Sequence, residues 1–160
     1  MLELAAAADL TSPSISVVAV PPSLQQYEAG TLCTVAGWGT TTEGGNMAEV
    51  VMKVGTSTGN TGYVRCSISS VSVGGQVEVP VVSDEECREA YGEDEIADSQ
   101  LCAGRAEGGA DACQGDDGAA LLCGRGLDGV VSWGYGCARP GLPGIYTQTS
   151  YFTQWILQWL

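Results

Sequence analysis

Short hydrophobic runs, separated by glycine, proline, asparagine and serine, dominate this chain. The runs cover residues 14–22, 31–39, 49–54, 77–82, 120–124, 128–134 and 144–149. Runs of this length that are bounded by turn residues are typical of β-strands. Because no repeated long helical pattern accompanies them, the sequence predicts an all-β domain, built as an antiparallel barrel or sandwich.

Two segments depart from this pattern and predict helices. The segment near 83–91 opens with a capping box, in which Ser83 precedes Glu86 by three residues. The tail near 151–159 places its aromatic residues four positions apart, on one face of a helix. We expect this face to dock on the strands. It comprises Tyr151, Trp155 and Trp159, with Phe152 and Ile156 beside them.

The composition fits one globular domain, or one and a fraction, since 44% of the 160 residues are hydrophobic. Six basic residues face nineteen acidic ones, which gives a net charge of −13. Nucleic acids and anionic membranes require a basic surface, so neither is expected as a partner. No stretch reaches the ~20 apolar residues of a membrane span.

The chain contains no histidine, which removes the commonest general base and most zinc sites. None of the seven cysteines forms a C-x-x-C pair, so neither a metal site nor another cofactor is expected. Their wide spacing predicts disulfides and an oxidising compartment, and the odd number leaves one cysteine over. The cysteines are Cys33, Cys66, Cys87, Cys102, Cys113, Cys123 and Cys137.

The first ten residues, MLELAAAADL, lack the features of a signal peptide. They carry Glu3 and Asp9, have no basic start, and hold only a short apolar run. A disulfide-rich chain without a secretion signal is a contradiction, and we expect a missing N-terminal part to resolve it.

Several motifs together resemble the trypsin-like serine proteases of the chymotrypsin fold, animal digestive trypsins in particular. They are TVAGWGTTTEGG, VPVVSDEECREAYG, LCAG, DACQGDDGAALLCG, VSWGYGCARPGLPGIYT and the closing aromatic segment. The resemblance implies one half of the family's double barrel, a six-stranded antiparallel barrel. Residues 1–32 would form the segment that crosses between barrels, and residues 33–160 the C-terminal barrel. The catalytic His and Asp would lie upstream on a missing N-terminal barrel, and the protein would be extracellular.

The resemblance also implies how the cysteines pair. It joins Cys33 to Cys123, Cys87 to Cys102, and Cys113 to Cys137, and leaves Cys66 free. Cys66 lies in residues 54–76, the stretch without family likeness. Deleting this stretch joins Lys53 to Val77 in a continuous strand pattern, which suggests a retained intron. The alternative is a true insertion in a surface loop, which costs little extra chain entropy.

The family's nucleophile turn reads Gly-Asp-Ser-Gly-Gly-Pro, where this chain has GDDGAA. By resemblance, Gly115 contributes an N–H to the oxyanion hole. Asp116 matches the buried aspartate that pairs with the mature N-terminus, and we expect it to be unpaired here, which is costly. Asp117 stands at the position of the nucleophilic serine.

The substrate pocket of the family is better preserved in the sequence. Asp111 matches the aspartate at the pocket floor that pairs with Lys or Arg, and Gly134 and Gly144 match the glycines of the pocket wall. Ser132, Trp133 and Gly134 match the strand edge that hydrogen-bonds the substrate backbone.

These residues predict a truncated trypsin-like endopeptidase, whose family reaction is hydrolysis after Lys or Arg. We expect this chain to be inactive, because histidine and the nucleophilic serine are missing. The alternative is a non-catalytic module that binds basic peptides or a protein partner.

Overall fold

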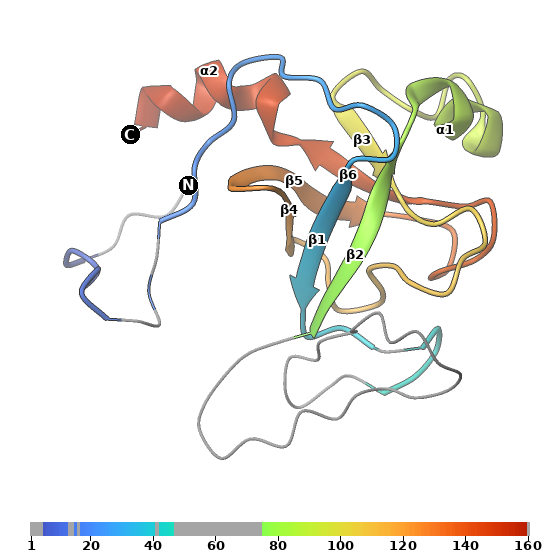
Figure 1. Cartoon of the computed structure of the whole chain (residues 1–160), viewed down its shortest axis with the longest axis horizontal. Helices are drawn as coiled ribbons and strands as arrows, with labels where there is room; N and C mark the ends of the chain where they lie inside the picture. Colours follow the sequence, from blue (N-terminus) through green and yellow to red (C-terminus); the bar gives the residue numbers. More distant parts are fainter. Residues whose placement is uncertain (1–4, 13–14, 16, 41, 47–74, 160) are drawn as a thin grey trace.

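Six antiparallel strands close into a barrel, in the order β1-β2-β3-β6-β5-β4 (Figure 1). The computed structural model describes residues 5–12, 15, 17–40, 42–46 and 75–159. The strands are β1 (Leu32–Gly37), β2 (Gly75–Val82), β3 (Gln100–Ala103), β4 (Ala120–Cys123), β5 (Gly126–Trp133) and β6 (Gly144–Gln148). The predicted all-β class and six-stranded barrel are confirmed.

Alternate residues of the strands fill the barrel. In β2, Val77, Val79 and Val81 point inward and are at most 8% exposed, which follows from the two-residue period of a strand. Buried residues of the other strands meet them in one core, among them Val35, Leu101, Leu121 and Tyr146. The pairing of β1 with β4 closes the barrel, and the Cys33–Cys123 disulfide joins these two strands.

The predicted strand at 14–22 is wrong for the described part of that run. Ala19 makes an isolated bridge to Gly126, while Val17 and Val18 are 78% and 49% exposed. Ala19 donates to Arg125 O at 3.3 Å and accepts from Leu127 N at 2.9 Å, but β1 and β4 already close the barrel, so among the described residues the pairing does not extend into a strand.

Two further differences concern the strands. The pattern of hydrophobic runs did not predict β3, most of which lies in the LCAG motif. β2 begins at Gly75, so the last two residues of the 54–76 stretch pair with β1, opposite Ala36 and Gly37. The rest of that stretch, with Cys66, and the run at 49–54 lie outside the described residues.

The short helix α1 (Asp84–Tyr91) forms as predicted and begins at a capped end. Ser83 Oγ accepts from the Glu86 N–H at 3.2 Å and donates to its carboxylate at 3.0 Å. Gly92 ends the helix with φ 112°, a conformation that favours glycine. The Cys87–Cys102 disulfide ties α1 to β3.

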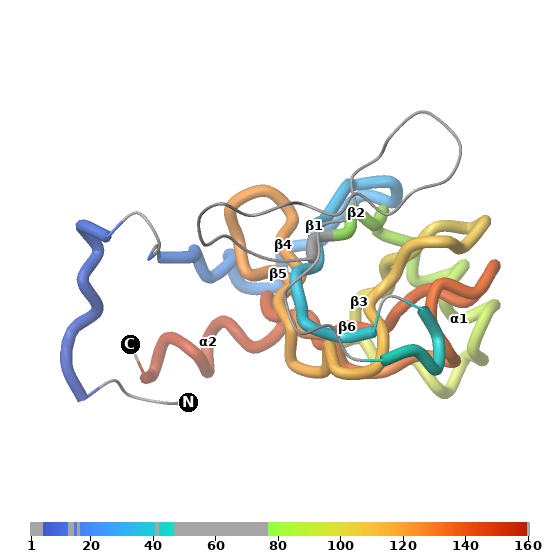
Figure 2. Tube along the Cα trace, turned by 90° about the horizontal axis from the view of Figure 1, so that it is seen from below, coloured from blue at the N-terminus to red at the C-terminus, as the bar shows by residue number. Residues whose placement is uncertain are grey.

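The C-terminal segment is helical, but it docks through the face opposite to the predicted one. It consists of η1 (Thr149–Phe152), α2 (Thr153–Ile156) and η2 (Leu157–Trp159), at the opposite end of the barrel from α1 (Figures 1 and 2). Ser150 and Thr153 are buried and donate hydrogen bonds to the carbonyls of Gln25 and Pro21. Tyr151, Trp155 and Trp159 are 47–63% exposed. These hydroxyls satisfy carbonyls of the segment before β1, so the polar face of the helical segment is the one that is buried.

No helix in the described part of the chain is long and apolar enough to cross a membrane.

Candidate active site

The turn that precedes β4 presents Asp117 to solvent. Gly115 and Gly118 adopt φ 93° and 80°, and backbone hydrogen bonds from Asp116 N to Cys113 O and from Ala119 N to Asp116 O close the turn. These left-handed positions explain why glycine occupies them. Asp117 lies at the apex, is exposed, and lines the cavity described below. Within the described residues, its carboxylate receives no hydrogen bond.

Asp116 points the other way and is not the unpaired charge that we expected from the sequence. Its carboxylate accepts hydrogen bonds from Gly39 N at 2.7 Å and Cys113 N at 3.0 Å. A Cβ on Gly37 would lie 1.8 Å from Asp116 Oδ1, and one on Gly39 would lie 2.5 Å from Cγ. The glycines at and just after the end of β1 therefore leave room for this carboxylate, and two backbone N–H groups satisfy it.

Asp111 lies in a cavity of about 310 Å³ between the turn, β5 and β6. Its Oδ1 accepts from Ala112 N at 2.8 Å, and its Oδ2 accepts from Ala138 N at 3.1 Å. Asp111 takes part in no ion pair among the described residues. The cavity brings together Asp111, Asp117, Ser132, Trp133, Gly134 and Gly144, which are far apart in the sequence.

The surroundings of Asp111 raise its pKa to about 6. Burial is the main cause, because it disfavours the charged carboxylate, and the charge of Asp116 acts in the same direction. The two backbone N–H donors, Ala138 and Ala112, oppose the rise. The carboxyl group is therefore mostly ionised at pH 7, and a cation that entered the cavity would stabilise its negative charge.

Gly134 and Gly144 line the cavity, but glycine is needed at the two positions for different reasons. A Cβ on Gly144 would lie 2.7 Å from Asp111 Oδ1, so this glycine is needed for the carboxylate to fit. A Cβ on Gly134 would meet nothing nearer than Tyr91 Oη at 3.8 Å. Glycine at 134 therefore keeps space open in the cavity rather than relieving a clash within the chain.

A bulge interrupts β5 where the strand lines the cavity. The register with β6 shifts between Val131 and Trp133, and Ser132 is exposed. A β-bulge leaves a residue out of the ladder and redirects the strand. Ser132 therefore lies outside the pairing of β5 with β6 and lines the cavity.

Sequence reasoning missed Tyr146, which lines the same cavity from β6. Its hydroxyl is buried and finds no hydrogen-bond partner among the described residues. Burial and the charges of Asp111 and Asp116 raise the pKa of this hydroxyl, so it stays protonated. The signal was available, because Tyr146 follows Gly144 by two residues and shares its face of the strand.

An aromatic group forms another part of the site that the sequence did not reveal. Tyr91 packs edge-on against Trp133, with ring centroids 5.2 Å apart, and Tyr135 contacts both rings. The Tyr91 hydroxyl donates to Pro143 O at 2.6 Å. Helix α1 thereby supports the chain on both sides of the 134–143 loop.

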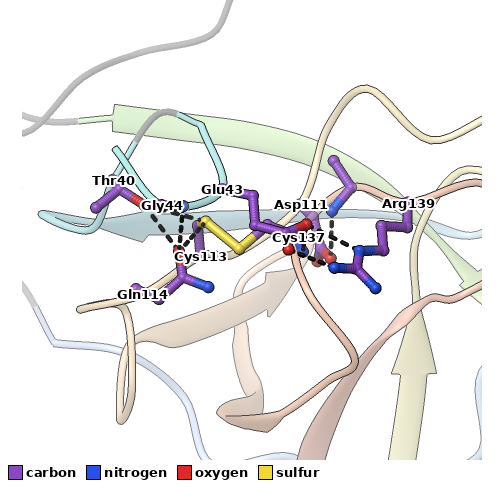
Figure 3. Close-up of polar contacts among 9 residues, drawn as sticks. Thr40, Glu43, Gly44, Asp111, Cys113, Gln114, Cys137 and Arg139 are labelled. Carbon is purple, nitrogen blue, oxygen red and sulfur yellow. Dashed lines mark hydrogen bonds and ion pairs between the residues drawn. A yellow bond between two sulfur atoms is a disulfide. The ribbon is translucent and has the colours of Figure 1, made fainter. Parts of the chain in front are cut away.

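The loop after β1 contacts the disulfide at the edge of the cavity (Figure 3). Thr40 N donates to Gln114 O at 2.9 Å, and Glu43 accepts from Arg139 and Cys137. The Cys113–Cys137 disulfide joins the turn to the 134–143 loop. With Cys33–Cys123 and Cys87–Cys102, these are the three pairs that the resemblance implies. In the described part of the chain, no group of three or more His, Cys, Asp or Glu could hold a metal ion.

Comparisons with known proteins agree with this architecture. The family model described as Trypsin matches residues 53–156. The chain is 45% identical to Trypsin-1 of Astacus astacus, over 89% of this chain and 52% of the relative. It is 39% identical to Trypsin eta of Drosophila erecta, over 89% and 46%, and 37% identical to Trypsin II-P29 of Gallus gallus, over 98% and 52%. The chain spans about half the length of these relatives. It belongs to the trypsin family.

Proposed function

We propose that this chain carries the substrate pocket of a trypsin-like endopeptidase, binds Lys or Arg side chains there, and does not hydrolyse the bound peptide. The observation that carries the proposal is the Asp111 carboxylate, held in a cavity by two N–H groups and without an ion-pair partner among the described residues. A carboxylate in such a place is poorly solvated and attracts a cationic side chain.

The shape of the cavity supports the same ligand class. Gly134 leaves room for a long side chain, and Gly144 makes room for the Asp111 carboxylate that would meet its charge. The edge at Ser132 would receive the peptide backbone. Residues 132–134 and 111 would thus recognise the main chain and the side chain of the same ligand.

Asp117 is the reason to expect no hydrolysis. A carboxylate that attacked a peptide carbonyl would form an anhydride, and its charge would oppose the oxyanion that Gly115 is proposed to stabilise. The 160 residues also contain no histidine to act as general base. The family reaction, cleavage after Lys or Arg, therefore needs a nucleophile and a base that this chain does not contain.

A second candidate is that peptide capture is itself the function. The pocket keeps Asp111, Gly134 and Gly144, whereas the nucleophile turn has lost its serine. A module that binds basic peptides or a protein partner requires the first set and not the second. Proteins of this class would show saturable binding and no turnover.

We further propose the domain organisation that the resemblance implies. Residues 1–32 would cross to an N-terminal barrel, residues 33–160 form the C-terminal barrel, and residues 54–76 are an insertion within it. Support comes from the start of β1 at Leu32 and from the exposed Trp155 and Trp159, which a second barrel could cover. The three disulfides support an extracellular location.

Benzamidine, a small aromatic cation, tests the pocket directly. Isothermal titration of the full chain at pH 8 should show one binding site, Asp111→Asn should abolish it, and Asp94→Asn, at an exposed carboxylate, should leave it unchanged. Equal binding by wild type and Asp111→Asn would refute the pocket assignment. A chromogenic arginine amide tests the rest, because any turnover by the chain that Asp117→Asn removes would show that it is an active hydrolase.

A further inference from the structure

The loop after β1 and the loop between β5 and β6 are joined by one ion pair beside the Asp111 cavity. Arg139 donates to the Glu43 carboxylate through Nε, at 2.9 Å from Oε2, and through Nη2 to Oε1 (Figure 3). The same Oε2 accepts from Cys137 N at 3.3 Å. One carboxylate therefore holds residues on both sides of Ala138.

Ala138 adopts a backbone conformation that alanine avoids. Its φ is 54°, in the left-handed region that favours glycine. Such a conformation persists when its surroundings determine it. Here the Ala138 carbonyl accepts from Gly109 N at 3.0 Å, its N–H donates to Asp111, and Glu43 fixes its two neighbours.

The Ala138 N–H is the contact that ties Asp111 to the far side of the cavity. Among the described residues, Asp111 Oδ1 bonds only to Ala112, its neighbour in the chain, whereas Oδ2 reaches across to Ala138. If Ala138 turned away, the carboxylate would lose a donor and part of its orientation. The contacts of Glu43, which fix the residues on both sides of Ala138, thus influence the pKa and the orientation of the Asp111 carboxylate.

We propose that Glu43 and Arg139 are positioning residues for cation recognition: their ion pair, with the Cys137 N–H, holds Ala138 in its left-handed conformation and so fixes the Asp111 carboxylate. This inference rests on the proposed binding of a cation by Asp111. Neither side chain touches the ligand, and both act through the backbone of residues 137–139.

The exposure of the ion pair separates this role from a contribution to stability. The two side chains are 52% and 39% exposed, and exposed ion pairs add little to the stability of a fold. Breaking the pair should therefore leave the melting temperature almost unchanged while it weakens binding in the pocket. A purely structural role would instead lower the melting temperature and leave binding in the pocket unchanged.

The test compares Glu43→Ala, Glu43→Gln and wild type, each as the full chain, in benzamidine titrations at pH 8 and across pH. We expect Glu43→Ala to weaken binding about tenfold, the effect of losing one hydrogen bond to a charged group. Glu43→Gln keeps an oxygen acceptor for Cys137 N and should lose less. In Glu43→Ala the pH midpoint of binding should also move upward, because the Ala138 N–H lowers the pKa of Asp111.

Asp98→Asn is the matched control, because it breaks the Arg88–Asp98 ion pair, 2.9 Å long, next to α1 and not at the cavity. It should leave the dissociation constant and the pH midpoint at their wild-type values. The exchange variant Glu43→Arg/Arg139→Glu restores a pair between the loops and should recover part of the affinity lost in Glu43→Ala.

Two results would overturn the inference, and they are distinguishable. If wild type does not bind benzamidine, the proposed function fails and this inference with it. If wild type binds and Glu43→Ala matches it in affinity and pH midpoint, the inference alone fails. Hydrogen exchange at the Ala138 amide in the ligand-free protein gives a second measurement: faster exchange in Glu43→Ala supports the role, and unchanged exchange refutes it.

Discussion

Binding of a cation by the Asp111 pocket should depend on pH in a way that the structure sets. In the proposed function the cation binds the ionised carboxylate, and the pKa of Asp111 is raised to about 6, chiefly by burial. At pH 8 the carboxyl group is ionised and benzamidine binds at full strength. At pH 5 about one tenth of the molecules carry the charge, so the dissociation constant should be about tenfold larger.

The same titration has the opposite sign for stability. In the unfolded chain Asp111 has its ordinary pKa of 3.8, so between about pH 4 and pH 6 the folded protein holds more protons than the unfolded one. Stability from this group is therefore fully present below pH 4 and is lost as pH rises through 6. A rise of about two pKa units corresponds to at most roughly 3 kcal/mol, because solvent reaches part of the site. Asp111→Asn should gain stability at pH 8 while it loses binding.

Titration calorimetry at pH 5, 6, 7 and 8 measures the first effect, and urea unfolding of wild type and Asp111→Asn at pH 4.5 and 8 measures the second. At pH 6, binding should also release about half a proton per site, which is detected by repeating the titration in buffers of different ionisation enthalpy. A dissociation constant that is constant from pH 5 to 8, with no proton release, would show that Asp111 does not titrate in this range and would refute the reasoning.

Three further predictions concern the stability of the barrel. Asp128 is 2% exposed and accepts hydrogen bonds from Tyr27 Oη at 2.5 Å and Cys123 N at 2.6 Å. Asp128→Ala should therefore lower the free energy of unfolding, measured by urea titration, by roughly 3 kcal/mol. An unchanged urea midpoint would contradict this prediction. Val79→Ala, at a fully buried position, should cost about 2 kcal/mol, against less than ~0.5 for Val18→Ala at an exposed one. Tyr146→Phe removes a buried hydroxyl that has no partner among the described residues, so its melting temperature should equal or exceed that of wild type. A clear fall would show that a water molecule satisfies this hydroxyl.

The strands other than β3, and α1, were predictable because their signals are local. Val77, Val79 and Val81 alternate with polar or less buried residues, and Ser83 with Glu86 marks the start of the helix. The family motifs added the barrel and its closure, which alternation alone leaves open between a barrel and a sandwich.

What the sequence could not reveal depends on contacts between distant residues. Glu43 pairs with Arg139, 96 residues away in the sequence. The aromatic group of Tyr91, Trp133 and Tyr135 joins α1 to the end of β5. The run at 14–22 has strand propensity, yet its described residues make only the bridge from Ala19 to Gly126, because the barrel is already closed. In the tail, hydrophobic periodicity identified the helix and its aromatic face, but the docking face was decided by the carbonyls that Ser150 and Thr153 satisfy.

The two adjacent aspartates, Asp116 and Asp117, show why the structure of the pocket does not depend on the residue at the catalytic position. Asp116 fills a space that Gly37 and Gly39 leave open and accepts two N–H groups, so replacing it would leave those donors unsatisfied. Asp117 projects into solvent from glycine-flanked backbone, and the turn is closed by main-chain bonds that do not depend on its side chain. A serine or an aspartate at 117 should thus fold equally well. The fold that builds the Asp111 pocket places no demand on the residue that would perform catalysis, and the two can change independently.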